Sequence, residues 1–252
     1  MGPAKRRQGD IFDLVQYLDP RLNFGQVRRA LRRFVGVAPS AKDARGEAAA
    51  DSPVPVAVRW IRRRRLRRGS HVWSYLAGRR GLPTAVLDAA AAADAVREGA
   101  AGSAWFAHRN NDGVVTHVEI RGPDFKGSLR GGSKTLFRLP GAGPRHLRLV
   151  ITEAPIDALS VAAIENIRAD TLYAATGGGM GPATVQAIER LLAHMGPLTG
   201  ALLAGAADAD PAGERYAARY AALAAAAGVA FERLAPPAGT DWNDFLVQRR
   251  KG

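Results

Sequence analysis

Three carboxylates stand where two predicted strands end. Glu153 closes the run LVITE, and Asp208 and Asp210 close the run GALLAGAADAD. Because the carboxyl ends of parallel strands meet at one edge of a sheet, we expect these side chains to face one another there. Clustered carboxylates repel one another unless a cation compensates them, and oxygen ligands select Mg²⁺ or Mn²⁺. The pattern therefore predicts a metal site built from these three residues.

Each of these acids also has a simpler interpretation. Asp210 precedes Pro211 and could serve only as the N-cap of the next helix, and the other two could be solvated. The coincidence of three acids at strand ends favours metal binding. Asp157 lies four residues after Glu153, at a predicted helix start. It either stabilises that helix through the dipole or joins the metal site as a further ligand.

Glycines mark a second turn of the same kind. Gly177 and Gly178 open the triplet 177–179, which follows the run TLYAAT and precedes a predicted helix. Backbone without side chains can approach a phosphate or a metal closely, so both glycines are candidates for nucleotide binding. Glycine at such a turn can also be required by geometry alone.

The elements that must position these residues follow from hydrophobic patterning. From residue 146 onward, apolar strands alternate with helices, which indicates an α/β fold with a mainly parallel sheet flanked by helices on both faces. Residues 103–139 hold β-prone runs separated by Asn-Asn-Asp-Gly, which predicts a hairpin. An Ala-rich helix is expected near 84–97 and short helices near the N-terminus. The predicted C-terminal helices are 156–167, 182–194, 212–226 and 242–250.

Composition excludes several classes of protein. Of the 252 residues 47% are hydrophobic, too many for a wholly disordered chain. The absence of cysteine excludes disulfides, thiolate metal sites and a cysteine nucleophile, and it fits a reducing compartment. No apolar stretch reaches membrane-spanning length, and the first residues do not resemble a secretory signal. We therefore expect a cytoplasmic protein with no membrane association.

The positive charge is concentrated at one end of the sequence. Residues 1–80 hold 19 Lys or Arg against 6 Asp or Glu, whereas 81–252 hold 17 of each. A basic first third predicts contact with a polyanion such as DNA. Its densest part runs from Arg62 to Arg68, which is either a phosphate-binding strip or a solvated charged face. Nearby aromatic residues could stack on bases or belong to the core. The members of interest are Arg62, Arg63, Arg64 and Arg65, flanked by Trp60, Trp73 and Tyr75.

The acidic motifs resemble a known family. EAPIDALS at 153–160 and DADPAG at 208–213 are similar to the Toprim domain, which bacterial-type primases, topoisomerases and small nucleases share. The resemblance covers roughly 145–252. It implies that Glu153, Asp208 and Asp210 are catalytic and bind Mg²⁺ or Mn²⁺. The sequence after the acidic pair is closer to primases than to topoisomerases.

Upstream stretches resemble the same primase group. YLAGRRGL at 75–82 is similar to the helix before the catalytic core of replicative primases. Residues 114–139 resemble the primase basic subdomain, and this resemblance makes Arg121, Lys126 and Lys134 candidates for binding nucleotide or template. Residues 1–37 resemble the helical tail that follows a primase zinc ribbon, although its metal ligands are absent. Either the chain begins after that module or the module has degenerated.

The implied organisation is that of plasmid and mobile-element proteins that join an uncharacterised N-terminal region to a Toprim domain. The expected parts are a helical remnant at 1–37, a linker at 38–58, a basic α+β primase-like subdomain at 59–144 and the Toprim catalytic domain at 145–252.

The resemblance implies a Mg²⁺-dependent primase-like nucleotidyltransferase that acts on single-stranded DNA with ribonucleotides in plasmid replication or transfer. A helicase, a relaxase or another replication protein would be its partner. Two alternatives stay open. The same carboxylates would serve a phosphodiesterase, that is, a nuclease, and a non-catalytic single-strand DNA-binding accessory protein would need only the basic region.

Overall fold

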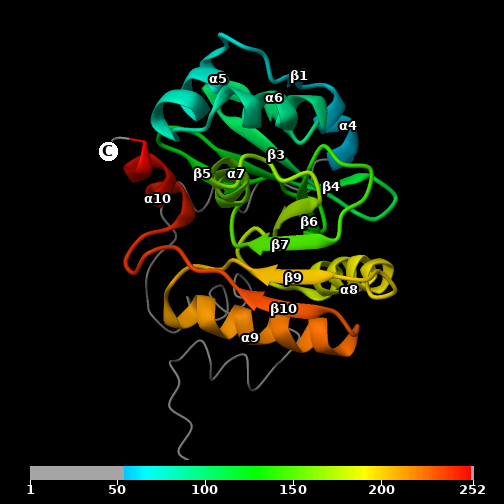
Figure 1. Cartoon of the computed structure of the whole chain (residues 1–252). Helices are drawn as coiled ribbons and strands as arrows, with labels where there is room; N and C mark the ends of the chain where they lie inside the picture. Colours follow the sequence, from blue (N-terminus) through cyan, green and yellow to red (C-terminus); the bar gives the residue numbers. More distant parts are fainter. Residues whose placement is uncertain (1–53, 251–252) are drawn as a thin grey trace, which may run out of the picture. The chain divides into compact units, whose positions relative to one another are not determined.

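The computed structural model describes residues 54–250, which form one compact unit around a mixed sheet of ten strands (Figure 1). Eight strands follow the order β1-β2-β3-β6-β8-β7-β9-β10, while β4 pairs with β3 and β5 pairs with β4. The sheet is continuous across residue 145, where the two C-terminal parts were expected to meet. Near that residue the pairing changes from antiparallel to parallel. Strand β6 is antiparallel to β8, whereas β7 is parallel to β8.

The first half of the sheet is antiparallel, and the predicted hairpin is confirmed by β3 and β4, which pair Trp105 with Ile120. Nearly all residues of β3 and most of those of β4 are buried, and a short turn joins the two strands. The elements are α4 (Val56–Ile61), β1 (Arg64–Arg65), α5 (His71–Ser74), the π-helix η1 (Tyr75–Arg79), α6 (Thr84–Ala92), β2 (Val96–Glu98), the 3₁₀ turn η2 (Ala100–Gly102), β3 (Ala104–Arg109), β4 (Val115–Arg121), β5 (Lys126–Ser128) and β6 (Leu136–Pro140).

The second half confirms the predicted alternation of strands and helices. Strands β8, β7, β9 and β10 are parallel, as continuous apolar runs with helical crossovers require. The elements are β7 (Arg148–Thr152), α7 (Pro155–Ile164), β8 (Thr171–Ala175), α8 (Pro182–Met195), β9 (Leu202–Gly205), α9 (Pro211–Ala226), β10 (Ala230–Arg233) and α10 (Trp242–Arg249).

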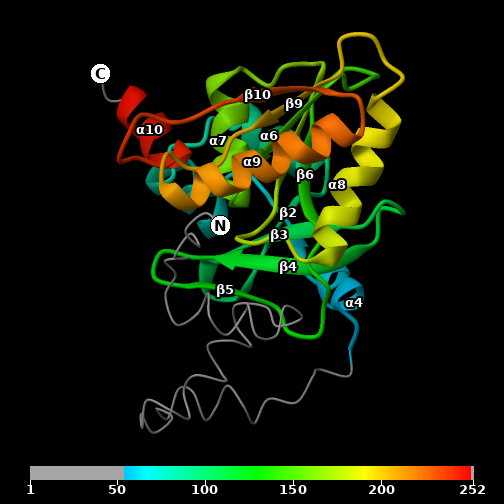
Figure 2. The ribbon, with the colours of Figure 1, turned by 90° about the horizontal axis from the view of Figure 1, so that it is seen from below.

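Helices cover both faces of the sheet, as expected (Figure 2). Residues of α6, α7 and α10 share one apolar core, and residues of α8 and α9 share a second one on the other face. A third, smaller cluster lies beneath α4 and includes Trp60 and Trp105. Trp60, Trp73 and Tyr75 are all buried, so the core interpretation of these aromatic residues is confirmed.

The Ala-rich helix ends earlier than predicted. Helix α6 stops at Ala92, Asp94 takes a left-handed conformation with φ of 49°, and Val96 begins a strand opposite Phe106. Burial of Val96 in the sheet outweighs the helix propensity of the surrounding alanines, because propensity is a weak preference beside tertiary packing.

The helices expected within 1–37 and most of the expected linker lie outside the described residues. Within 54–250, no helix combines the length and the apolar character needed to cross a membrane.

Candidate metal and nucleotide site

The parallel strands bring the predicted carboxylates to one edge of the sheet. Strand β7 ends at Thr152, directly before Glu153, and its neighbour β9 ends three residues before Asp208. The two strands pair in parallel, so their carboxyl ends point the same way in Figure 1. Beyond β9 the pairing continues for one hydrogen bond, from Ala206 N–H to the carbonyl of Ile151 at 2.8 Å. The chain then turns into α9 at Asp210.

Electrostatics show that these acids act on one another. Burial raises the pKa of Glu153, and the charges of Asp208 and Asp210 raise it further, while a backbone hydrogen bond from Asp208 offsets part of the shift. Burial also raises the pKa of Asp208, followed by the charges of Asp241 and Asp210. The site is therefore a partly desolvated cluster of negative charge.

Two carboxylate oxygens in this cluster accept no hydrogen bond from the described residues. Glu153 Oε1 and Asp208 Oδ1 are buried and find no hydrogen-bond partner among residues 54–250. Asp210 Oδ1 instead accepts a hydrogen bond of 2.6 Å from Gly213 N–H and so caps α9. Gly213 is required here, because a β-carbon would collide with the Asp208 carbonyl oxygen.

The donor set fits a hard cation only in part. Within the described residues, no group of three or more Asp, Glu or His side chains could hold a metal ion as placed. Mg²⁺, however, is usually bound through one or two carboxylates while waters and substrate phosphates complete its shell. The unpartnered oxygens of Glu153 and Asp208 meet that requirement, with Asp210 at the rim of the cluster.

Asp157 lies in the same cluster rather than only at a helix start. It is buried in the first turn of α7, and burial, followed by the charges of Asp241 and Asp208, raises its pKa well above the usual range. A hydrogen bond from the backbone of Asn243 opposes that shift. The side chain of Asn243 donates to Ser160 Oγ at 3.0 Å and holds α10 against α7.

The glycine turn after β8 binds the backbone of Glu153. The N–H groups of Gly177 and Gly178 both donate to the Glu153 carbonyl oxygen, at 2.8 and 3.0 Å. Both glycines have φ near +70°, a conformation that favours glycine. These N–H groups are thus engaged with the chain itself, and the glycines position the backbone of a carboxylate.

The three cations predicted to bind nucleotide, Lys134, Lys126 and Arg121, lie on the side of the sheet that carries the acids. Lys134 is half-buried and its Nζ donates to the Gly177 carbonyl at 2.7 Å; burial lowers its pKa. The exposed Lys126 lowers the pKa of Asp208, so it lies within electrostatic reach of that carboxylate. Arg121 forms an ion pair with Glu119. Strands β4 and β5 therefore place positive charge beside the acidic edge.

The arginine run is not brought to this site. Strand β1 is the sheet edge, five strand spacings from β7 or about 24 Å. Arg62, Arg64 and Arg65 are exposed there, whereas the Arg63 guanidinium lies 4.4 Å from the centre of the Trp105 ring.

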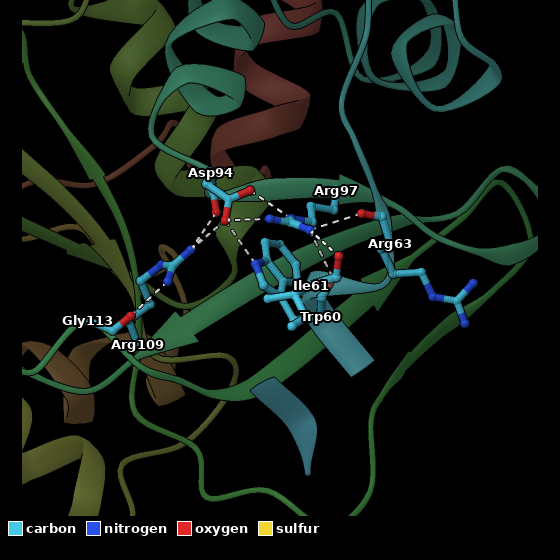
Figure 3. Close-up of polar contacts among 7 residues, drawn as sticks. All are labelled: Trp60, Ile61, Arg63, Asp94, Arg97, Arg109 and Gly113. Atoms are coloured by element: carbon cyan, nitrogen blue, oxygen red, sulfur yellow. Dashed lines mark hydrogen bonds and ion pairs between the residues drawn. The ribbon is translucent and has the colours of Figure 1, made fainter. Parts of the chain in front are cut away.

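Figure 3 shows how the backbone of the run is held. Arg97 donates to the carbonyl oxygens of Trp60, Ile61 and Arg63, at 3.2, 3.0 and 3.0 Å, and it is bound in turn by Asp94. The arginine side chains thus project from a fixed stretch of backbone.

Comparisons with known proteins agree with this geometry. A family model described as Toprim-like matches residues 150–246. The chain therefore carries a Toprim-like domain. A second model, described as a protein of unknown function (DUF3991), matches residues 74–143. No curated protein matches the chain significantly.

Two solved primases are similar in structure to this chain. The Aquifex aeolicus primase, solved with its zinc-binding and RNA polymerase domains, is 16% identical, with a TM-score of 0.50; the match covers 96% of this chain and 69% of that one. The primase fragment of the bacteriophage T7 primase-helicase is 18% identical, with a TM-score of 0.45 and 68% of each chain covered. The first of these likenesses shows that this chain has the fold of bacterial-type primases.

Three further residues around the acidic edge are not among the predicted site residues, although the sequence makes Asp241 a minor candidate for the rim of the site. Asp241 caps α10 and faces Asp157 and Asp208. Arg233 of β10 donates to the carbonyl oxygens of Ala207 and Asp208, at 2.8 and 2.9 Å, and so fixes the loop that carries the acidic pair.

The third unpredicted residue, Glu119, is buried on β4 between His108, at 3.7 Å, and Arg121. The alternation of His117, Glu119 and Arg121 on one strand face was the only signal that sequence offered for it.

Proposed function

We propose that this chain is a Mg²⁺-dependent primase-like nucleotidyltransferase that acts on single-stranded DNA. The observation that carries this proposal is the pairing of opposite charges at one edge of the sheet. Glu153 and Asp208 present unpartnered buried oxygens there, and Lys126 lies within electrostatic reach of Asp208. Phosphoryl transfer needs chiefly positioning and charge neutralisation, which this arrangement supplies.

Each residue has a role in that reaction. Glu153 and Asp208 would hold the ion, with Asp210 at the rim and Asp157 as a further acid behind them. A bound Mg²⁺ neutralises phosphate charge and orients the reacting oxygens. Lys126, Lys134 and Arg121 would bind the phosphates of the ribonucleotide or the template. Gly177 and Gly178 keep Glu153 in place through its carbonyl oxygen.

Incubation with a single-stranded template, Mg²⁺ and labelled ribonucleotides tests the proposal. We expect short labelled products from the wild type and a loss of at least about 100-fold in Asp208→Asn, because one charge-stabilising group is removed. Glu189→Gln, an exposed acid on α8, is the matched control and should retain full activity. Full activity in Asp208→Asn would contradict the metal site.

The same assay separates the rival functions. A shortened template in place of new products would indicate a phosphodiesterase, since water would then be the nucleophile at the same site. The capping of α9 by Asp210 favours a third possibility, a single-strand-binding accessory protein without catalysis. Calorimetric titration with Mg²⁺ and Mn²⁺ decides this, because absence of binding to the wild type would support the accessory role.

The exposed arginines at the β1 edge would retain the DNA. Removing one arginine–phosphate interaction reduces the salt dependence of single-strand binding by about 0.7 in log–log slope. Replacing Arg62, Arg64 and Arg65 by Gln should therefore weaken binding and flatten the slope by about 2. An unchanged slope would refute this assignment. Action in plasmid replication or transfer, beside a helicase or a relaxase, belongs to the same proposal.

A further inference from the structure

The turn between β4 and β5 presents an aromatic ring to solvent. Phe125 is 58% exposed, and the only other exposed large hydrophobic residues among those described are Ile61 and Val114. Strand β4 runs toward the same side of the molecule as the carboxyl ends of β7 and β9 (Figures 1 and 2). Lys126, the next residue after Phe125, lies within electrostatic reach of Asp208, so the turn lies on the side of the molecule that carries the acidic edge.

The ring of Phe125 is held in place by a glycine. A β-carbon at Gly127 would lie 2.8 Å from Cζ of Phe125 and 3.1 Å from its Cε1, so the ring packs against the bare α-carbon. The turn itself is closed by a hydrogen bond of 2.8 Å from Gly122 N–H to the Phe125 carbonyl. One part of the ring thus rests on backbone while the rest faces solvent. A ring fixed in this way loses little conformational entropy when a ligand stacks on it.

A groove adjoins this turn. Its volume is about 620 Å³, within the usual range of pockets for nucleotide-sized ligands. Pro123 of the turn forms part of its wall, and Arg79 pairs with Asp124 of the same turn at 3.7 Å. The other lining residues are His71, Ser74, Tyr75, Ala101 and Gly102.

The surroundings of the ring indicate a polyanionic ligand with flat apolar groups. Arg79 on the groove wall and Lys126 beside the ring are exposed cations, which suit phosphates. The exposed ring suits a base, because every nucleic-acid base has a π-face that can stack on an aromatic side chain. An acidic peptide would use the cations but not the ring.

We propose that Phe125 and the adjoining groove bind the bases of single-stranded nucleic acid and so hold the strand beside the carboxylate cluster. This inference rests on the proposed function for the identity of the strand, but it concerns binding and not catalysis. Nothing in the site described above assigns a role to Phe125.

Binding of a labelled thymidine 20-mer in EDTA tests the inference without metal or turnover. Phe125→Ala should weaken binding about 5- to 150-fold, the loss expected for one base–aromatic stack. Phe125→Leu should lose most of the same affinity, because it keeps apolar bulk and lacks the π-face. The salt dependence of binding should stay unchanged, since no phosphate contact is removed. Val114→Ala, an exposed residue just before β4, is the matched control and should bind as the wild type does.

An abasic strand of equal length sharpens the test. It keeps the phosphates and lacks the bases, so wild type and Phe125→Ala should bind it equally. Wild-type affinity of Phe125→Ala for the thymidine strand would overturn the inference. An equal loss on the abasic strand would overturn it as well.

A tryptophan at position 125 gives a direct signal. The four native tryptophans are buried, so Phe125→Trp should be quenched by the thymidine strand, whereas Val114→Trp should not. Stronger quenching by a ribonucleoside triphosphate than by the strand would overturn the assignment to single-stranded nucleic acid. If these results hold while no primer synthesis is found, the proposed catalysis fails and the binding site stands.

Discussion

Two partly buried carboxylate sites in this molecule differ in what compensates their charge. Asp94 accepts hydrogen bonds from Trp60, Arg97 and Arg109, at 3.0, 2.7 and 3.0 Å (Figure 3). Burial alone would raise its pKa, but the bonds from Arg97 and Trp60 and the nearby charges hold it below the usual value. At the carboxyl ends of β7 and β9, burial and the charges of neighbouring acids raise the pKa of Glu153 and of Asp208.

This difference in compensation distinguishes a carboxylate that stabilises the fold from carboxylates that are available to bind a ligand. Asp94 is satisfied within the chain and links α4 to β2 and β3, so nothing further has to bind there. At the Toprim-like edge, Arg233 and Lys126 compensate only part of the negative charge, and the pKa values of Glu153 and Asp208 stay raised. This is the arrangement expected where a cation and phosphates bind. Substitutions in the two groups should therefore differ in the size and in the sign of their effects.

Removing the charge of Asp94 should strongly destabilise the protein. Asp94→Asn tolerates the left-handed backbone and leaves Arg97 buried without its counter-charge, so we expect a loss of about 3 kcal/mol. Urea denaturation measures it. Asp88→Asn removes an exposed partner of Arg68 and should leave the free energy of unfolding nearly unchanged, because solvent screens this ion pair. Equal effects of the two variants would contradict the contrast.

Glu119 is intermediate between these two sites, because its charge is compensated and it also pairs with Arg121 of the proposed nucleotide site. Its pKa is lowered despite burial, through His108 and Arg121. Glu119→Gln should weaken ribonucleotide binding by raising KM about 3- to 10-fold, and it should cost about 1–2 kcal/mol of stability by leaving Arg121 unpaired. Steady-state kinetics that separate KM from kcat check this. A fall in kcat at unchanged KM would contradict a positioning role.

Removing the charge of Asp208 should have the opposite effect on stability from Asp94. Asp208→Asn relieves repulsion from Asp241 and Asp210, so without metal we expect equal or greater stability, by up to about 1 kcal/mol. Thermal unfolding in EDTA measures it. Destabilisation by more than about 1 kcal/mol would show that the carboxylate is structural.

The two groups should also respond to pH with opposite signs. Asp94 has a lowered pKa in the folded state, so its contribution is present above the unfolded value of about 4 and is lost as pH falls further. Asp157 has a raised pKa, so its contribution is present below about 4 and is lost as pH rises through the folded value.

Unfolding free energies measured in EDTA between about pH 3 and pH 8 test these signs. Asp94→Asn should reduce the loss of stability at low pH, and Asp157→Asn should reduce the loss on the rise toward neutral pH. Parallel pH profiles of the two variants would contradict the assignment.

The sequence alone determined the order of strands and helices in the C-terminal half. It also placed Glu153, Asp208 and Asp210 at one edge, because apolar periodicity and strand ends are local properties that can be counted along the chain. The helix expected near 84–97 was too long, since burial of Val96 in the sheet is not a local property.

Only the tertiary structure decided what surrounds those acids. Asp241, Arg233 and Glu119 come from separate elements. Glu119 reaches the Toprim-like edge through the pairing of β3, β6 and β8, Arg233 through the pairing of β10 with β9, and Asp241 through the docking of α10 on α7. It likewise decided that Asp94 would be compensated and Asp208 would not. The net charge around a carboxylate depends on neighbours distant in the sequence, whereas its place at the end of a strand does not.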